Sequence, residues 1–110
     1  MLTYETWRPW LQAKATELKS DNLTTRFDAS PGDSPKPGMA LGLIGQRAMG
    51  NFECWITGEA DYTILAPPSP DARMVCHKWG LIVTDETFEA TFHEFISEFR
   101  LREFDELSGR

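Results

Sequence analysis

Residues 51–65, NFECWITGEADYTIL, carry the clearest fold signal in the chain. Over Asn51–Thr57 apolar and polar residues alternate, which is the two-residue period of a half-buried β-strand. A tight turn at Gly58-Glu59 and a second strand over Ala60–Leu65 follow. The stretch therefore predicts an antiparallel hairpin, with Trp55 on the face that points away from the core. The residues expected to point inward from the first strand are Phe52, Cys54 and Ile56.

Strand-like segments continue on both sides of this hairpin. The segment Leu23–Ala29 is a short candidate strand, and Met39–Gln46 is a small, apolar one. Met74–Val83 predicts a long strand that is central in the sheet or bent near Gly80, since glycine inside a strand often marks a bulge. Proline-rich segments predict loops at Ser30–Gly38 and Ala66–Asp71.

Amphipathic helices are predicted at both ends of the chain. Near the start, apolar residues recur at helical spacing, and Pro9 favours Thr6 as the N-cap because proline is harmless only in the first turn. Near the end, five apolar residues share one helical face, with Thr84 or Asp85 as the cap. A charged tail at Arg100–Arg110 is expected to fray. The two apolar stripes are Trp7, Trp10, Leu11 and Leu18, and Phe88, Phe92, Phe95, Ile96 and Phe99.

Taken together, these segments predict one α+β domain over residues 1–110. About five strands form an antiparallel β-meander, because sequential strands joined by short turns usually pair with their neighbours. The N-terminal and C-terminal helices pack on one face of the sheet. The other face is left uncovered, and we expect the function to lie there.

Charge narrows the class of partner. The net charge is −6, and it is uneven: residues 1–50 carry a balance of +1, whereas residues 51–110 carry −7. An acidic half argues against nucleic acid or an anionic membrane as partner and favours a basic protein surface. The alternative is that the charge only keeps the protein soluble. The first ten residues lack the features of a signal peptide, so the cytoplasm is the expected location.

Catalytic and metal-binding patterns are weak. Cys54 and His77 are the likeliest nucleophile and base, but no third group accompanies them, and a structural role is expected for both. His93 lies on the final helix and completes no zinc ligand set with His77. The segment GMALGLIG at Gly38–Gly45 lacks the Lys-Ser/Thr ending of a phosphate-binding loop. We therefore expect no cofactor, no metal, no enzymatic activity and two reduced cysteines.

Binding is the remaining class of function. Trp55, flanked by carboxylates on the uncovered face, resembles an interface hot spot, unless the loop Ser30–Gly38 covers it. Trp79 and Tyr62 are expected to pack within the sheet, although Tyr62 is also a candidate to join this patch. The acidic final helix is a second candidate surface, since no Lys or Arg is interspersed over Asp85–Glu98. The residues predicted to bind a partner are Glu53, Trp55, Glu59, Asp61, Tyr62, Glu89 and Glu94.

The chain resembles the TriTu-type immunity proteins over most of its length. The resemblance rests on the Trp7 and Trp10-Leu11 helix, the pattern Gly50-Asn51-Phe52-x-x-Trp55-x-Thr57-Gly58-Glu59-x-Asp61, and the closing helix with its Phe stripe. It implies a protein that binds the catalytic domain of a cognate toxin and blocks its NAD or substrate cleft. The implied toxin is an Rhs-associated ADP-ribosyltransferase that modifies elongation factor Tu.

Three alternatives stay open beside this hypothesis. The chain would fit a small enzyme or ligand-binding domain that uses Cys54 and His77. It would also fit a structural adaptor in a phage or secretion assembly. A homodimer formed through the uncovered sheet face is compatible with either role.

Overall fold

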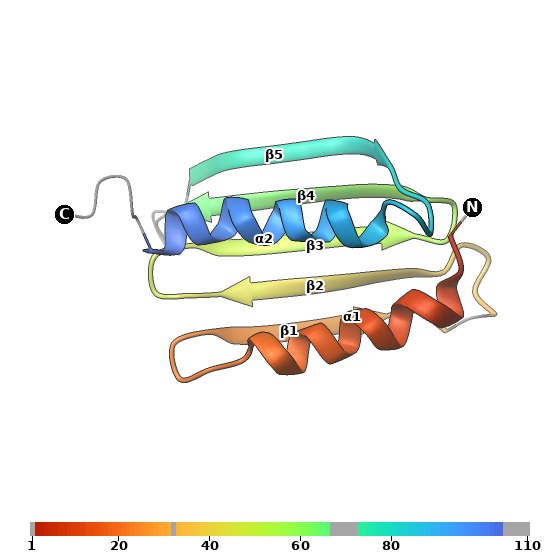
Figure 1. Cartoon of the computed structure of the whole chain (residues 1–110), viewed down its shortest axis with the longest axis horizontal. Coiled ribbons are helices and arrows are strands. Elements are labelled where there is room, and N and C mark those ends of the chain that lie inside the picture. Colours follow the sequence, from red (N-terminus) through yellow and green to blue (C-terminus); the bar gives the residue numbers. More distant parts are fainter. Residues whose placement is uncertain (1, 32, 67–72, 105–110) are drawn as a thin grey trace.

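The computed structural model describes residues 2–31, 33–66 and 73–104 (Figure 1). In chain order the elements are α1 Tyr4–Leu18, β1 Thr24–Ala29, β2 Gly38–Ile44, β3 Met49–Trp55, β4 Glu59–Ala66, β5 Arg73–Ile82 and α2 Phe88–Phe104. Residues 67–71 of the predicted loop Ala66–Asp71 and residues 105–110 of the predicted tail Arg100–Arg110 lie outside the described part of the chain.

The strands form one antiparallel sheet in the order β1-β2-β3-β4-β5. Each strand pairs with the one before it, so the sheet is a meander, and the predicted α+β fold is confirmed. The quoted hairpin is present with a regular register, in which Phe52 lies opposite Tyr62 and Glu53 opposite Asp61. Because side chains alternate along a strand, this register sends Phe52 and Tyr62 to one face and the two carboxylates to the other.

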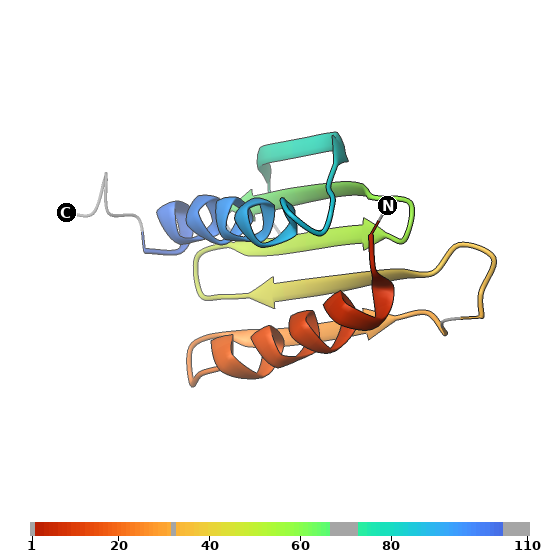
Figure 2. The ribbon, with the colours of Figure 1, turned by 45° about the vertical axis from the view of Figure 1, so that its right-hand side comes forward.

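Both helices cover the same face of the sheet. Helix α1 packs on β1 and β2, and α2 packs on β3 and β4. The two helices start at the same end of the sheet, and both views show no helix over β5 (Figures 1 and 2). Aromatic rings join the helices at that end: Trp7 stacks on Phe88 with centroids 4.4 Å apart, and Trp10 meets Phe92 edge to face. Within the described residues, neither helix has the length and apolarity needed to cross a membrane.

The hydrophobic core lies between the helices and this covered face. Inward-facing residues of β2, β3 and β4 meet the Phe stripe of α2. Burying one aromatic ring this completely contributes several kcal/mol, so the core accounts for much of the stability. The largest fully buried side chains are Tyr62, Phe52, Phe88, Phe92, Phe95, Leu11, Leu41, Leu43 and Ile64.

The start of α1 differs from the prediction. The helix begins at Tyr4 with Thr3 as N-cap, not at Thr6, and Pro9 lies inside it. The reason is tertiary: the backbone N–H and the hydroxyl of Thr3 donate to the carboxylate of Asp85, at 2.8 and 2.6 Å. The indole N–H of Trp7 donates to the same carboxylate. These contacts offset the hydrogen bond that proline removes from a helix interior.

Asp85 therefore does not cap α2. Helix α2 begins at Phe88, and a turn over residues 85–87 precedes it. The carbonyl of Thr84 accepts from the N–H of Phe88, and the N–H of Thr84 donates to the hydroxyl of Thr87, so Thr84 closes this turn. Neither predicted cap, Thr84 or Asp85, directly precedes the helix. Hydrogen bonds from Thr3 and from Trp7 lower the pKa of Asp85, which keeps its carboxylate charged at the start of α1.

The far end of α2 fixes the β2–β3 turn. The Glu103 carboxylate is buried and accepts the backbone N–H groups of Gln46, Arg47 and Ala48, each at 2.9 Å. The turn begins at Gly45, where a Cβ atom would collide with that carboxylate. A buried carboxylate is tolerated here because the three N–H groups satisfy it.

Candidate functional site

The uncovered side of the sheet is the candidate site. We call it the open face: it carries the outward residues of the sheet, and no described helix lies on it (Figure 2). On β2 three of the outward residues, Gly38, Ala40 and Gly42, are small, whereas Ile44 at the end of the strand is large and exposed. The larger outward side chains include Arg26, Asp28, Ile44, Glu53, Trp55, Glu59, Asp61, Met74, His77, Trp79 and Ile82.

Exposed apolar side chains lie on this face, one on β2 and three along β5. Among the described residues, seven large apolar side chains are classed as exposed, and four of these belong to the open face. Large exposed apolar patches with a polar surround commonly mark interaction sites. The four residues are Ile44, Met74, Trp79 and Ile82.

Trp55 points to the open face, as predicted, but a loop restrains it. The ammonium of Lys36, from the proline-rich loop, lies 5.6 Å from the centre of the indole. The same ammonium pairs with the Glu59 carboxylate at 2.6 Å. The indole also rests against Gly38, where an added Cβ would come within 2.7 Å of the ring. Trp55 is half-buried as a result, which is closer to the covered alternative than to a free hot spot.

Two carboxylates on the open face lie opposite each other and have no cationic partner among the described residues. Glu53 and Asp61 are directly opposite across β3 and β4, and neither side-chain carboxylate makes a hydrogen bond or ion pair with another described residue. Burial, and then the charge of Asp61, raise the pKa of Glu53. Like charges at opposed positions are unfavourable in the isolated protein. Glu59 differs, because hydrogen bonds from Lys36 and Thr57 lower its pKa.

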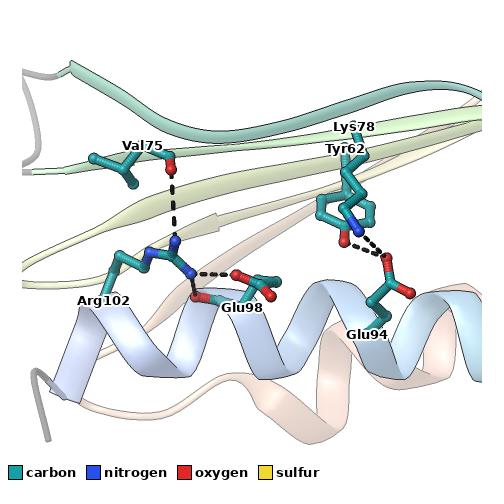
Figure 3. Close-up of polar contacts among 6 residues, drawn as sticks. All are labelled: Tyr62, Val75, Lys78, Glu94, Glu98 and Arg102. Atoms are coloured by element: carbon teal, nitrogen blue, oxygen red, sulfur yellow. Dashed lines mark hydrogen bonds and ion pairs between the residues drawn. The ribbon is translucent and has the colours of Figure 1, made fainter. Parts of the chain in front are cut away.

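Tyr62 does not belong to the open face, so the prediction that it joins the Trp55 patch is wrong. Its side chain is 0% exposed and points under α2, where its hydroxyl donates to Glu94 at 2.5 Å (Figure 3). Tyr62 points inward because it lies two residues from Ala60 and two from Ile64, which also point inward. The hydrogen bond from Tyr62 is the main cause of a lowered pKa at Glu94.

The acidic residues of α2 lie on the opposite side of the molecule and are largely paired. Glu94 also meets Lys78 of β5, and Glu98 pairs with Arg102 of its own helix (Figure 3). Glu89 lies 3.6 Å from His93. The structure therefore divides the predicted binding residues between two surfaces. Glu53, Trp55, Glu59 and Asp61 are together on the open face, whereas Glu89 and Glu94 are on the helical side.

Trp79 is the residue that sequence reasoning missed. It was expected to pack within the sheet, yet its side chain is 74% exposed. The strand β5 that carries it is an edge strand and not a central one, while the predicted bend near Gly80 is confirmed by a register shift there. The available signal was the sequence Trp79-Gly80, since a glycine in a strand marks places where the ladder is interrupted.

The nucleophile and base considered from the sequence do not meet. Cys54 is buried on the covered face, whereas His77 lies opposite Thr63 on the open face. Burial raises the pKa of the Cys54 thiol to about 12, so it is not a ready nucleophile. Both cysteines are free, and β4 separates Cys54 from Cys76. In the ranges 2–31, 33–66 and 73–104 no cluster of potential metal ligands forms.

A groove opens between the two helices at their C-terminal ends. Its volume is about 240 Å³, and apolar side chains of α1, β2 and α2 form most of its wall. It lies on the covered side, away from the residues predicted to bind a partner. The residues that line it include Leu18, Leu23, Leu43, Ile96, Phe99 and Phe104.

Comparison with known proteins gives one match. A family model described as "Immunity protein TriTu" matches residues 5–98, which span α1, the whole sheet and most of α2. A search of curated proteins and a search of solved structures each found no match. The resemblance seen in the sequence is thereby confirmed by an independent comparison.

Proposed function

The chain belongs to the TriTu family of immunity proteins, and from this we propose that it binds the catalytic domain of a cognate toxin through the open face and occludes it. Immunity of this kind needs a tight, specific contact and no chemistry by the immunity protein itself. Binding in the cytoplasm, before the toxin reaches its target, is sufficient.

The observation that carries this proposal is the combination of two features on one surface. The open face holds four exposed apolar side chains and the pair Glu53 and Asp61, whose carboxylates have no cationic partner among the described residues. Apolar anchors inside a charged border are typical of protein interfaces. The helical side is a weaker candidate for the interface, because Glu94 and Glu98 already have cationic partners in the chain. The open face is therefore the preferred interface over α2.

For the toxin, we propose an ADP-ribosyltransferase, as the resemblance implies. Such an enzyme must hold the pyrophosphate of NAD, and sites that bind phosphates are usually lined by cationic side chains and helix N-termini. The carboxylates of Glu53 and Asp61 are complementary to a surface of that kind.

Co-expression tests the proposal. The chain is produced together with the catalytic domain of the toxin encoded beside it, and growth and ADP-ribosylation of elongation factor Tu are followed. We expect full protection and a stable one-to-one complex. A toxin that remains active in the presence of excess immunity protein contradicts the proposed occlusion. Protection against a toxin with a different activity contradicts only the assignment of toxin class.

Charge reversal then locates the interface. We expect the double variant Glu53→Lys, Asp61→Lys to slow association and to reduce its dependence on salt, because rim charges steer encounter. The matched control is Glu86→Lys, an exposed acid at the start of α2. If the control slows association and the double variant does not, the interface lies on the helical side.

A further inference from the structure

The most exposed large apolar side chain that the structure describes is Trp79, on the edge strand β5. Its neighbours on the open face are also exposed, with Ile82 at 71%. The ring of His77 lies 6.5 Å from the indole and forms one side of the patch. A tryptophan left in water costs free energy in the isolated protein, so its position calls for an explanation beyond folding.

A bulge holds Trp79 in this position. Lys78 pairs with Tyr62 and Leu81 with Ala60, which leaves Trp79 and Gly80 together opposite Asp61. Gly80 has φ +71°, and an added Cβ would meet no atom within 4 Å. Glycine is therefore required by the backbone conformation and not by lack of space. Bulges of this kind redirect a side chain at functional positions.

Both flanks of the bulge are fixed to the rest of the molecule. On one side the ammonium of Lys78 reaches across to Glu94 of α2, at 3.4 Å. On the other side Leu81 packs against the core, and the N–H of Val83 donates to the carbonyl of Gly58. Trp79 is thus presented from a rigid base, and little conformational freedom has to be lost when it binds.

The charges around Trp79 define what it can bind. Asp61 lies across from the bulge, and Glu53 lies across from Asp61, so the nearest open-face charges are negative. A second copy of the chain is a poor occupant, because it would bring two acidic C-terminal halves together, each with a balance of −7 over residues 51–110. A protein surface bordered by Lys and Arg is complementary.

We propose that Trp79 is the anchor of the interface: its indole enters an apolar pocket of the toxin, and basic side chains at the border of that pocket meet Asp61 and Glu53. This rests on the proposed function, and it assigns the central contact to the β5 edge of the open face, two strands away from β3, which carries Trp55. Interface energy is usually concentrated in a few such aromatic anchors, with neighbouring contacts close to neutral.

Alanine substitution tests the anchor directly. We expect Trp79→Ala to lower the affinity for the toxin's catalytic domain by about thirtyfold or more, measured by calorimetry, with an unchanged urea midpoint for the free protein. The matched control is Phe104→Ala, which removes an exposed aromatic ring from α2 on the other side of the molecule. The control is expected to bind like the wild type.

Substitution of the glycine tests the bulge without removing the indole. We expect Gly80→Asn to bind nearly as well as the wild type, since asparagine tolerates a positive φ. Gly80→Val is expected to weaken binding, because a β-branched residue resists this conformation and the strand must rearrange. Equal affinities for the two variants, both folded, contradict the role of the bulge in positioning Trp79.

The outcomes separate the two proposals. If the wild-type chain binds the toxin and Trp79→Ala binds equally well, the anchor is wrong and the proposed function stands. If the wild-type chain does not bind the toxin, the proposed function fails and the anchor with it. If the free wild-type chain sediments as a dimer and Trp79→Ala as a monomer, the face joins two copies, which also overturns the anchor.

Discussion

Two tryptophans point outward from the same sheet face, and they are held in opposite ways. Trp55 ends β3 beneath a loop, where Lys36 covers its ring and Gly38 supports it. Trp79 lies on a bulge of the edge strand with no cover, and its side chain is the more exposed of the two. An outward direction in the alternating pattern therefore does not decide function. The surroundings contributed by other segments decide whether the ring stabilises the fold or remains available.

The contrast separates two sets of charged groups on the open face. Lys36 lies over the ring of Trp55 and pairs with the carboxylate of Glu59. The carboxylates of Glu53 on β3 and Asp61 on β4 have no cation from the described residues. A partner that supplies cations therefore gains most at Glu53 and Asp61.

Removal of Trp55 should produce the largest change in stability. We expect Trp55→Ala to lower the free energy of unfolding by about 2 kcal/mol, because a half-buried ring loses its contacts. Trp79→Ala should change it by less than about 0.5 kcal/mol. Urea denaturation of both variants measures the difference. Similar losses in the two variants would show that Trp79 also supports the fold.

A methyl group at Gly38 should disturb the contacts that hold the Trp55 ring. We expect Gly38→Ala to cost about 1–2 kcal/mol of stability, because the new Cβ displaces the indole of Trp55. The matched control is Gly42→Ala on the same strand and face, where the nearest atom lies 3.8 Å away. Thermal melts of both variants provide the measurement. If Gly42→Ala lost stability and Gly38→Ala did not, the proposed contact between Gly38 and the Trp55 ring would be contradicted.

Loss of the covering cation should have a smaller effect. In Lys36→Met, the contribution of the ammonium over the indole disappears, which is about 0.5–1 kcal/mol at a partly exposed site. The pKa of Glu59 should rise toward its usual value, because Lys36 is the main cause of its lowering. Carboxyl chemical shifts followed by NMR titration report this change. If the titration of Glu59 is unaltered in Lys36→Met, the pairing of Lys36 with Glu59 is contradicted.

The smallest effect is a pH dependence of stability that differs in sign between Glu53 and Glu59. The pKa of Glu53 is raised on folding, so its favourable contribution is complete below the usual carboxyl pKa and is lost as pH rises through the raised value. Glu59 has a lowered pKa, so its contribution is lost as pH falls. We therefore expect Glu53→Gln to be more stable than the wild type at pH 7 but not at pH 4. Urea midpoints at both pH values that show a constant difference would contradict this.

Much of the fold follows from local patterns. The alternation over residues 51–65 correctly predicts the β3–β4 hairpin, and the Phe stripe correctly predicts α2. The same alternation places Tyr62 inward together with Ala60 and Ile64. The wrong prediction that Tyr62 joins the Trp55 patch did not follow this alternation. Patterns of this kind are reliable where one side of an element is buried along its whole length.

The errors arise where a distant segment decides. Nothing near Thr3 announces that Asp85 will hold the start of α1, so Pro9 alone favoured a later start. A strand's own sequence does not reveal that no further strand will pair with it, which is why a central position stayed open for β5 beside the bend near Gly80, and why Trp79 was placed inside the sheet. The candidate site could not be predicted fully for the same reason: the exposure of its residues depends on which distant segments leave them uncovered.

The contact between Thr3 and Asp85 spans 82 residues of sequence, and it sets an order of events during synthesis. Helix α1 leaves the ribosome first, but the carboxylate that fixes its first turn is translated only after the last strand. At typical elongation rates of about 5–20 residues per second, the N-terminal segment waits several seconds for its partner. This contact therefore forms only after all five strands have been translated, and a nascent chain halted before residue 85 lacks it.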